Sequence, residues 1–227
     1  MKQVSPSTFD FLRALKENNN RDWFDKNKER YKTEERKLKS FFLQVKDDLN
    51  VTDSIEKMKI FRIYKDVRFS KNKIPYNIHR SASFSRATEY LRGSYYLKIE
   101  PNNSMLAGGF FQPNPSDLLR IRKELEMDAF ELREILADKK IKDIFGSLQG
   151  SEVKTAPRGF DKTHPNIDLI RKKSFLLGRS FTDEEVLSVN FVNSVRESFE
   201  ALRPFFDYMS DVLTTDLNGV SILGNDD

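Results

Sequence analysis

Apolar and polar residues alternate along residues 59–69, which is the pattern of a β-strand that packs on a core through one face. The apolar side holds Phe61, Ile63, Val67 and Phe69, and only Lys65 interrupts it. The residues of the polar side are Arg62, Tyr64, Asp66 and Arg68. The segment therefore predicts a strand whose polar face is either a solvated surface or the floor of a binding site.

Four further segments have the composition of strands, namely 81–86, 94–100, 104–112 and 174–181. Short turns such as Pro101-Asn102-Asn103 join the earlier ones, which favours an antiparallel meander that 174–181 can extend. Gly108-Gly109 predicts a bulge or a close approach of another backbone within its strand.

Helical periodicity marks both ends of the chain and its middle. Apolar residues recur every seven positions along 21–49, and a shorter helix that starts near Ser5-Pro6-Ser7 completes a helical hairpin over 5–50. Good start signals predict three short helices over 114–146 and C-terminal helices over 182–213, with a kink or a restart at Pro204.

These elements predict an α+β fold, with a mainly antiparallel β-sheet on which helices from both ends of the chain pack. The length of 227 residues suits one domain, which we expect to span 1–217. Within it, residues 59–112 form the sheet core, 153–181 hold a loop, a helix and a strand, and 218–227 form a flexible tail.

The composition excludes several classes of protein. There is no cysteine, so disulfides, thiolate metal sites and a cysteine nucleophile are excluded. No apolar run approaches the ~18 residues of a membrane span, and the first residues do not resemble a signal peptide, so we expect a cytoplasmic protein. The net charge of +4 permits a nucleic-acid partner without demanding one. The sequence indicates neither a cofactor nor an oligomeric state.

The polar strand face is the leading candidate site, for a small anionic ligand that carries phosphate or carboxylate groups. Arginine forks match such groups, so Arg62, Arg68 and Lys73 are expected to bind the anion. The expected supporting residues are Tyr64, Tyr76, Lys98 and Glu100, with Asp66 orienting the arginines. In the alternative interpretation, Asp66 simply pairs with an arginine and the other side chains face water.

Two other functions remain open. His79 with Asp66 or Glu100 could provide the acid and the base of a hydrolase-type enzyme. The long basic helix 21–49 could bind protein or nucleic acid, although its aromatic residues suit core packing better. No metal-binding motif, phosphate-binding loop or nucleophile elbow is present, so no metal site is expected.

Several blocks of sequence resemble a widespread, mostly bacterial family that is catalogued as domain of unknown function 2461. The blocks are FLRALKENNNRDWFDKNKERY, FRIYKDVRFSKNKIPY, YYLKIEP with GGFFQP, and APRGFDKTHP with KSF. They occur in order, and the likeness covers about 9–213. The resemblance implies a single α+β domain and transfers no activity.

Overall fold

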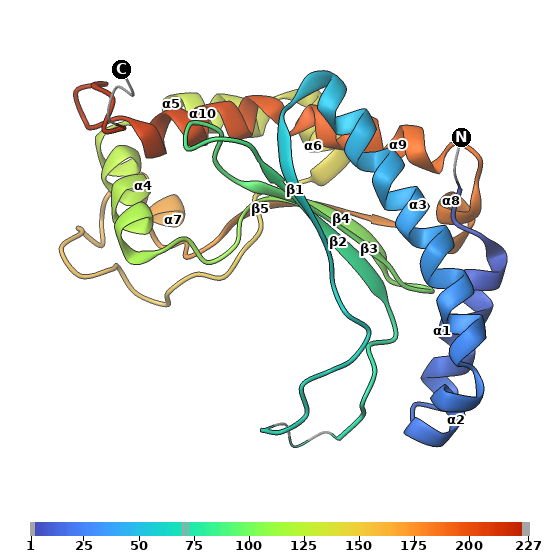
Figure 1. Cartoon of the computed structure of the whole chain (residues 1–227). Helices are drawn as coiled ribbons and strands as arrows, with labels where there is room; N and C mark the ends of the chain where they lie inside the picture. The colour runs from blue at the N-terminus through green and yellow to red at the C-terminus, as the bar shows by residue number, and fades with distance from the viewer. Residues whose placement is uncertain (1–2, 70, 72, 224–227) are drawn as a thin grey trace. The chain divides into compact units, whose positions relative to one another are not determined.

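The computed structural model describes residues 3–69, 71 and 73–223 (Figure 1). Its first part comprises α1 (Pro6–Glu17), α2 (Arg21–Lys26), α3 (Lys28–Thr52), β1 (Ile55–Ile60), β2 (Arg80–Arg86), β3 (Ser94–Ile99) and β4 (Ser104–Phe110). It continues with α4 (Pro115–Met127), α5 (Phe130–Ala137), α6 (Lys139–Phe145), α7 (Ile167–Ile170), β5 (Phe175–Phe181), α8 (Asp183–Leu187), α9 (Phe191–Ala201) and α10 (Arg203–Thr214).

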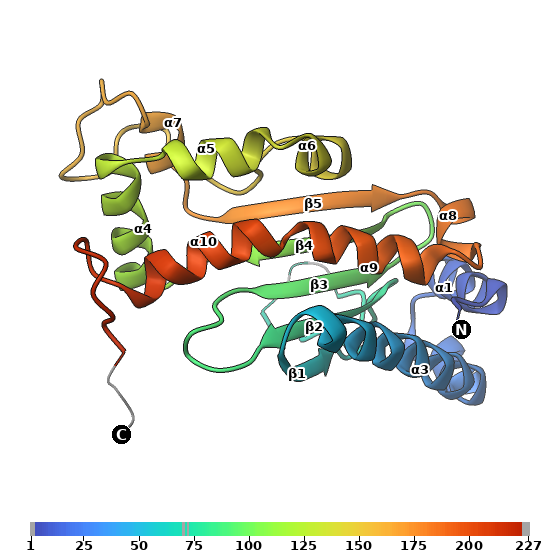
Figure 2. The same cartoon turned by 90° about the horizontal axis from the view of Figure 1, so that it is seen from above.

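The five strands form one antiparallel sheet in the order β1-β2-β3-β4-β5, which can be followed in Figure 2. Each strand is hydrogen-bonded to the next one in the chain, as the predicted meander requires. The α+β class is confirmed, and strands β2 to β5 lie where the sequence places them.

The predicted strand at 59–69 is wrong, because β1 begins at Ile55 and ends at Ile60. Phe61 and Phe69, which the alternation assigns to the core, are 36% and 96% exposed. Ile63 is fully buried, but it packs in a cluster with residues of α1 and α2. The alternation between apolar and polar residues therefore does not predict which of these side chains are buried, and it does not reflect packing on the sheet.

The single helix predicted over 21–49 is wrong, because α2 ends at Lys26 and α3 begins at Lys28. In the middle and at the end of the chain the helices agree with the sequence. Three short helices, α4 to α6, occupy the region predicted to hold them. At Pro204 the chain restarts: α9 ends at Ala201, and the proline lies in the first turn of α10, where its missing N–H costs nothing. In the described part of the chain, no helix is long and apolar enough to cross a membrane.

The chain divides into two compact units. Unit 1 comprises 1–84, 96–106 and 180–197, and unit 2 comprises 85–95, 107–179 and 198–227. Every residue that the sequence nominates for a site belongs to unit 1. The first part of the predicted tail 218–227 belongs to a turn in which Thr215 bridges to Ser221. Residues 224–227 lie outside the described residues.

In unit 2, Gly108-Gly109 confirms the predicted close backbone approach. A Cβ added to Gly109 would lie 2.1 Å from the carbonyl oxygen of Phe175 in β5, and the φ of Gly109 is +140°. A Cβ on Gly108 would lie 2.3 Å from a side-chain carbon of Leu202. The backbone of β4 therefore has no room for side chains at these two positions.

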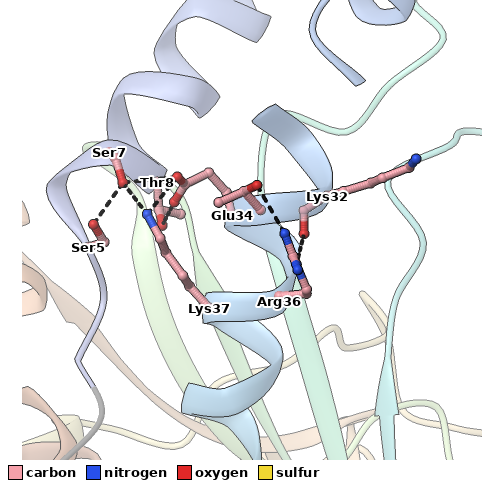
Figure 3. Close-up of polar contacts among 8 residues, drawn as sticks. Ser5, Ser7, Thr8, Lys32, Glu34, Arg36 and Lys37 are labelled. Carbon is pink, nitrogen blue, oxygen red and sulfur yellow. Dashed lines mark hydrogen bonds and ion pairs between the residues drawn. The ribbon is translucent and has the colours of Figure 1, made fainter. Parts of the chain in front are cut away.

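In unit 1, α1 is tied to α3 through a buried carboxylate. Glu34, which is 5% exposed, accepts hydrogen bonds from Ser7 Oγ (3.0 Å), Thr8 Oγ1 (2.8 Å) and Lys37 Nζ (2.8 Å), as Figure 3 shows. Burial alone would raise the pKa of Glu34, but the three hydrogen bonds hold it below its ordinary value. The carboxylate is therefore ionised and satisfied inside the contact between the two helices.

Candidate functional site

Residues 61–79, which we call the arm, run from the end of β1 to the start of β2 as an irregular two-stranded ribbon (Figure 1). Lys65 N donates to Pro75 O (2.8 Å), and Asn77 N donates to Ile63 O (2.7 Å). Between these bonds Tyr64 and Tyr76 form an antiparallel bridge. The arm therefore continues the β1–β2 hairpin in direction, without the regular pairing of a strand. Ser70 and Asn72 lie outside the described residues.

The base of the arm is fixed to α2 and to the turn before it. The Tyr76 ring, 4% exposed, stacks on Phe24 with centroids 4.0 Å apart and planes 14° apart. Asn19 binds the main chain of the same residue twice: its Nδ2 donates to Tyr76 O (3.0 Å), and its Oδ1 accepts from Tyr76 N (3.1 Å). Ile63 is buried in the same cluster. Tyr76 is therefore a structural anchor of the arm.

Two of the nominated cations are already bound within the arm. The Arg68 guanidinium donates to both carboxylate oxygens of Asp66, at 2.7 Å for the shortest contact, and this pair is exposed. Asp66 has its pKa lowered mainly by the hydrogen bonds from Arg68. Lys73 Nζ donates to the carbonyl oxygens of Val67 (3.0 Å) and Arg68 (3.4 Å). Lys73 is thus bound to the main chain of the arm itself.

Three other cations of the arm are exposed, namely Arg62, Lys65 and Lys71. Among the described residues, no hydrogen bond or ion pair engages their side chains. The arm also exposes aromatic rings: Phe69 is 96% exposed, and Tyr64 is 48% exposed. Of the sequence candidates on the polar side, Arg62 and Tyr64 therefore remain accessible to a ligand.

The arm carries the whole charge excess of the chain. It holds five basic residues and one acidic residue, an excess of four, which equals the net charge of +4 of all 227 residues. The rest of the sequence has 34 residues of each sign, and the excess is therefore confined to 19 residues between β1 and β2.

His79, Lys98 and Glu100 form a second group at the end of the arm. His79 is half-buried, and burial lowers the pKa of its imidazole, while the charge of Glu100 acts to raise it. Glu100 Oε2 accepts hydrogen bonds from Lys98 Nζ (2.8 Å) and Asn103 Nδ2 (2.9 Å). Of the two carboxylates nominated as partners of His79, Glu100 is the one whose charge acts on the pKa of His79, and Asp66 is paired with Arg68.

A groove of about 410 Å³ lies next to this second group. It is lined by residues of α1 and of the segments that end the arm and follow β3: Leu12, Arg13, Lys16, Glu17, Ile78, Glu100, Pro101 and Asn102. Arg13, one of the cations in this lining, is held by Asp183 at 2.7 Å. The groove is large enough for a small molecule and has groups of both charges in its wall.

Arg80 follows the arm and has its side chain only 4% exposed. Its Nε donates to Glu35 Oε2 (2.7 Å), and its Nη2 donates to the other oxygen of the same carboxylate. Burial, and to a smaller degree the charge of Glu35, raises the pKa of the nearby Tyr31 hydroxyl to about 12. A bidentate ion pair therefore joins the end of the arm to α3.

Comparison with known families identifies the chain. A family model described as a conserved hypothetical protein (DUF2461) matches residues 7–208. The chain belongs to the DUF2461 family. The match covers the arm, the groove and the greater part of both units of this DUF2461 chain, and the family description names no activity. A search of curated proteins found no match.

The sequence did not nominate several residues of the candidate site. Arg13 and Lys16 lie on a helix whose periodicity indicates packing, and nothing local shows that they line a groove. Lys65 interrupts the apolar side of the predicted strand, so the pattern does not place it among the residues of the polar face. Among the described residues, no cluster of three or more histidine, cysteine, aspartate or glutamate side chains could hold a metal ion.

Proposed function

We propose that the protein binds an anionic ligand through the arm, with Arg62, Lys65 and Lys71 as its principal contacts. The observation that carries this proposal is the confinement of the charge excess to residues 61–79. Basic side chains gathered on one element attract anions and raise their rate of encounter. The expected contacts differ from the initial set, because Arg68 and Lys73 already have partners within the arm.

The exposure of these cations favours a ligand with several negative charges. A single ion pair in water contributes about 0–1 kcal/mol, and salt at physiological strength screens it over about 8 Å. Several such contacts made together give useful affinity, and they make binding strongly salt-dependent. A phosphate-rich polyanion therefore suits the arm better than a small monoanion does.

The test measures binding of inorganic polyphosphate by the wild type and by two charge-matched triple variants. We expect Arg62→Ala/Lys65→Ala/Lys71→Ala to abolish most of the affinity. The control Lys26→Ala/Lys28→Ala/Lys39→Ala removes three exposed cations from α2 and α3 and should bind nearly as the wild type does. Equal losses in both variants would refute the role of the arm, and a larger loss in the control would favour the long helix as the interface.

A second candidate function is acid–base catalysis by His79 and Glu100. The groove beside them favours it, because Glu100 and Ile78, the neighbour of His79, both line that groove. Burial keeps the His79 imidazole neutral at neutral pH, which is the form that accepts a proton. In an NMR titration, Glu100→Gln should lower the pKa of His79 further. If the wild type hydrolyses chromogenic phosphate or carboxylate esters, His79→Gln should lose that activity. Turnover that survives His79→Gln would eliminate this candidate.

A further inference from the structure

The exposed aromatic residues of the arm lie next to its cations in sequence. Phe61 precedes Arg62, Tyr64 precedes Lys65, and Phe69 follows Arg68. Phe69 is almost fully exposed, and Tyr64 and Phe61 are 48% and 36% exposed. A single exposed ring on a surface is ordinary, but here three exposed rings lie within nine residues, each next in sequence to a basic residue. Exposed apolar groups that gather in this way often mark an interaction site.

Some of these rings are held in place by their neighbours. The Tyr64 ring lies edge-on to Phe24 with centroids 5.7 Å apart, and 5.5 Å from the ring of the buried Tyr76. Phe61 lies edge-on to Tyr96 at 6.1 Å, with Lys59 Nζ 5.2 Å from its centroid. The Arg68 guanidinium lies 5.9 Å from the centroid of Phe69. The arm thus presents flat apolar surfaces, and a cation lies over two of these rings, Phe61 and Phe69.

We propose that the ligand of the arm is single-stranded nucleic acid, whose bases stack on Phe69 and Tyr64 while Arg62, Lys65 and Lys71 contact its phosphates. This inference rests on the proposed function, because it names the class of polyanion that the arm binds. Sequence-tolerant single-strand binders combine a cationic track with aromatic rings on which bases stack. The ring and cation pairs of the arm supply both groups on one element.

A single strand fits the arm better than a duplex does. The bases of a duplex are stacked on each other, and only their edges are accessible in the grooves. An exposed ring such as that of Phe69 therefore has no base face to cover on intact duplex. On a single strand every base has a face that is free to stack.

The experiment compares two ligands that carry the same charge. One is an oligo(dT) of about 15 nucleotides, and the other is an abasic strand with the same number of phosphates, both labelled for fluorescence anisotropy. We expect the wild type to bind oligo(dT) about fivefold or more tightly than the abasic strand, because each stacked base adds affinity. Oligo(rU) should behave as oligo(dT) does, since stacking does not require the 2′-hydroxyl.

Two variants separate stacking from charge. Phe69→Ala should lower the affinity for oligo(dT) about fivefold, leave the abasic strand unaffected and keep the salt dependence unchanged. Arg62→Ala should weaken both ligands and reduce the slope of log K against log salt by about 0.7, the value for one single-strand phosphate contact. Phe111→Ala, which removes a 72% exposed ring from unit 2, is the matched control and should change nothing.

The outcomes are distinguishable. Equal affinity for oligo(dT) and the abasic strand would overturn the inference and leave polyanion binding intact. Tighter binding of duplex than of single strand would also overturn the inference. So would displacement of oligo(dT) by phosphatidylserine vesicles in a manner that requires Phe69, because the arm would then be a membrane-binding element. Failure to bind oligo(dT), the abasic strand and polyphosphate alike would reject both the inference and the proposed function.

Discussion

Glu35→Ala is expected to destabilise unit 1 by about 3 kcal/mol, although Glu35 itself is partly exposed. The substitution removes both acceptors of the Arg80 guanidinium, whose side chain is 4% exposed. Breaking a buried ion pair from one side costs about 3–5 kcal/mol, because the remaining charge stays out of water. We take the low end of that range, since Glu35 is 27% exposed and water can reach the vacated position.

The assay uses the one tryptophan of the chain, Trp23, which lies in unit 1 beside Phe11 at a centroid distance of 6.0 Å. Its fluorescence during urea unfolding reports on this unit, which matters because a chain of two units need not unfold in one step. With a slope of about 2 kcal/mol per molar urea, the midpoint should fall by about 1.5 M. The control is Glu29→Ala, which breaks an exposed pair with Lys32 and should leave the urea midpoint nearly unchanged.

A double variant checks the cause of the loss. Adding Arg80→Met to Glu35→Ala removes the stranded charge and keeps most of the apolar volume, so it should recover at least about half of the lost stability. The reasoning is refuted if Glu35→Ala costs no more than Glu29→Ala. It is also refuted if the double variant is less stable than Glu35→Ala, because the loss would then come from packing and not from an unpaired charge.

Three further predictions concern pH and packing. Burial lowers the pKa of His79 below its ordinary 6.5, so the unfolded chain binds more protons than the folded chain does as pH falls through that value. The stability of the wild type should therefore fall on acidification. In His79→Gln the urea midpoint should change less with pH between about pH 7.5 and 5.5. Because its pKa is lowered, Glu34 stabilises the fold at pH values above its ordinary pKa of 4.5, and this contribution disappears as pH falls below that value. Glu34→Gln should lower the free energy of unfolding by about 1–3 kcal/mol at pH 7 and lose less stability on acidification than the wild type does. An unchanged acid transition would contradict the role of Lys37 and Thr8. Gly109→Ala should destabilise unit 2 by about 2 kcal/mol or more, measured as faster amide exchange in β4, and unaltered exchange would contradict the clash with the backbone of β5.

Local pattern was sufficient for most of the fold. The strands β2 to β5 and the restart at Pro204 follow from alternation, turn residues and the chemistry of proline. Residues 61–69 also alternate, yet Ile63 is buried against α1 and α2, whereas Phe69 is exposed. A period of two shows that one face is apolar, but it does not show which body, if any, covers that face.

The parts of the site that the sequence missed depend on tertiary pairing. The sequence predicts Lys73 as an anion ligand, but its ammonium group donates to carbonyl oxygens of the arm itself. Glu35 and Arg80 are 45 residues apart, and no local signal joins them. In contrast, the concentration of charge in 61–79 can be counted from the sequence alone, although its significance emerges only once the arm is known to be exposed.

The two hydrogen bonds between Asn19 and Tyr76 have a consequence for self-association. The neighbours of Tyr76 bond across the ribbon, so its own N–H and C=O point outward, as they do along the free edge of a sheet. Such an edge is a template on which another chain can add a strand. The amide of Asn19 offers one donor and one acceptor in the places where that strand would bond, and so it acts as a one-residue substitute for a neighbouring strand. A single side chain thereby shields the arm from edge-to-edge pairing at its buried end.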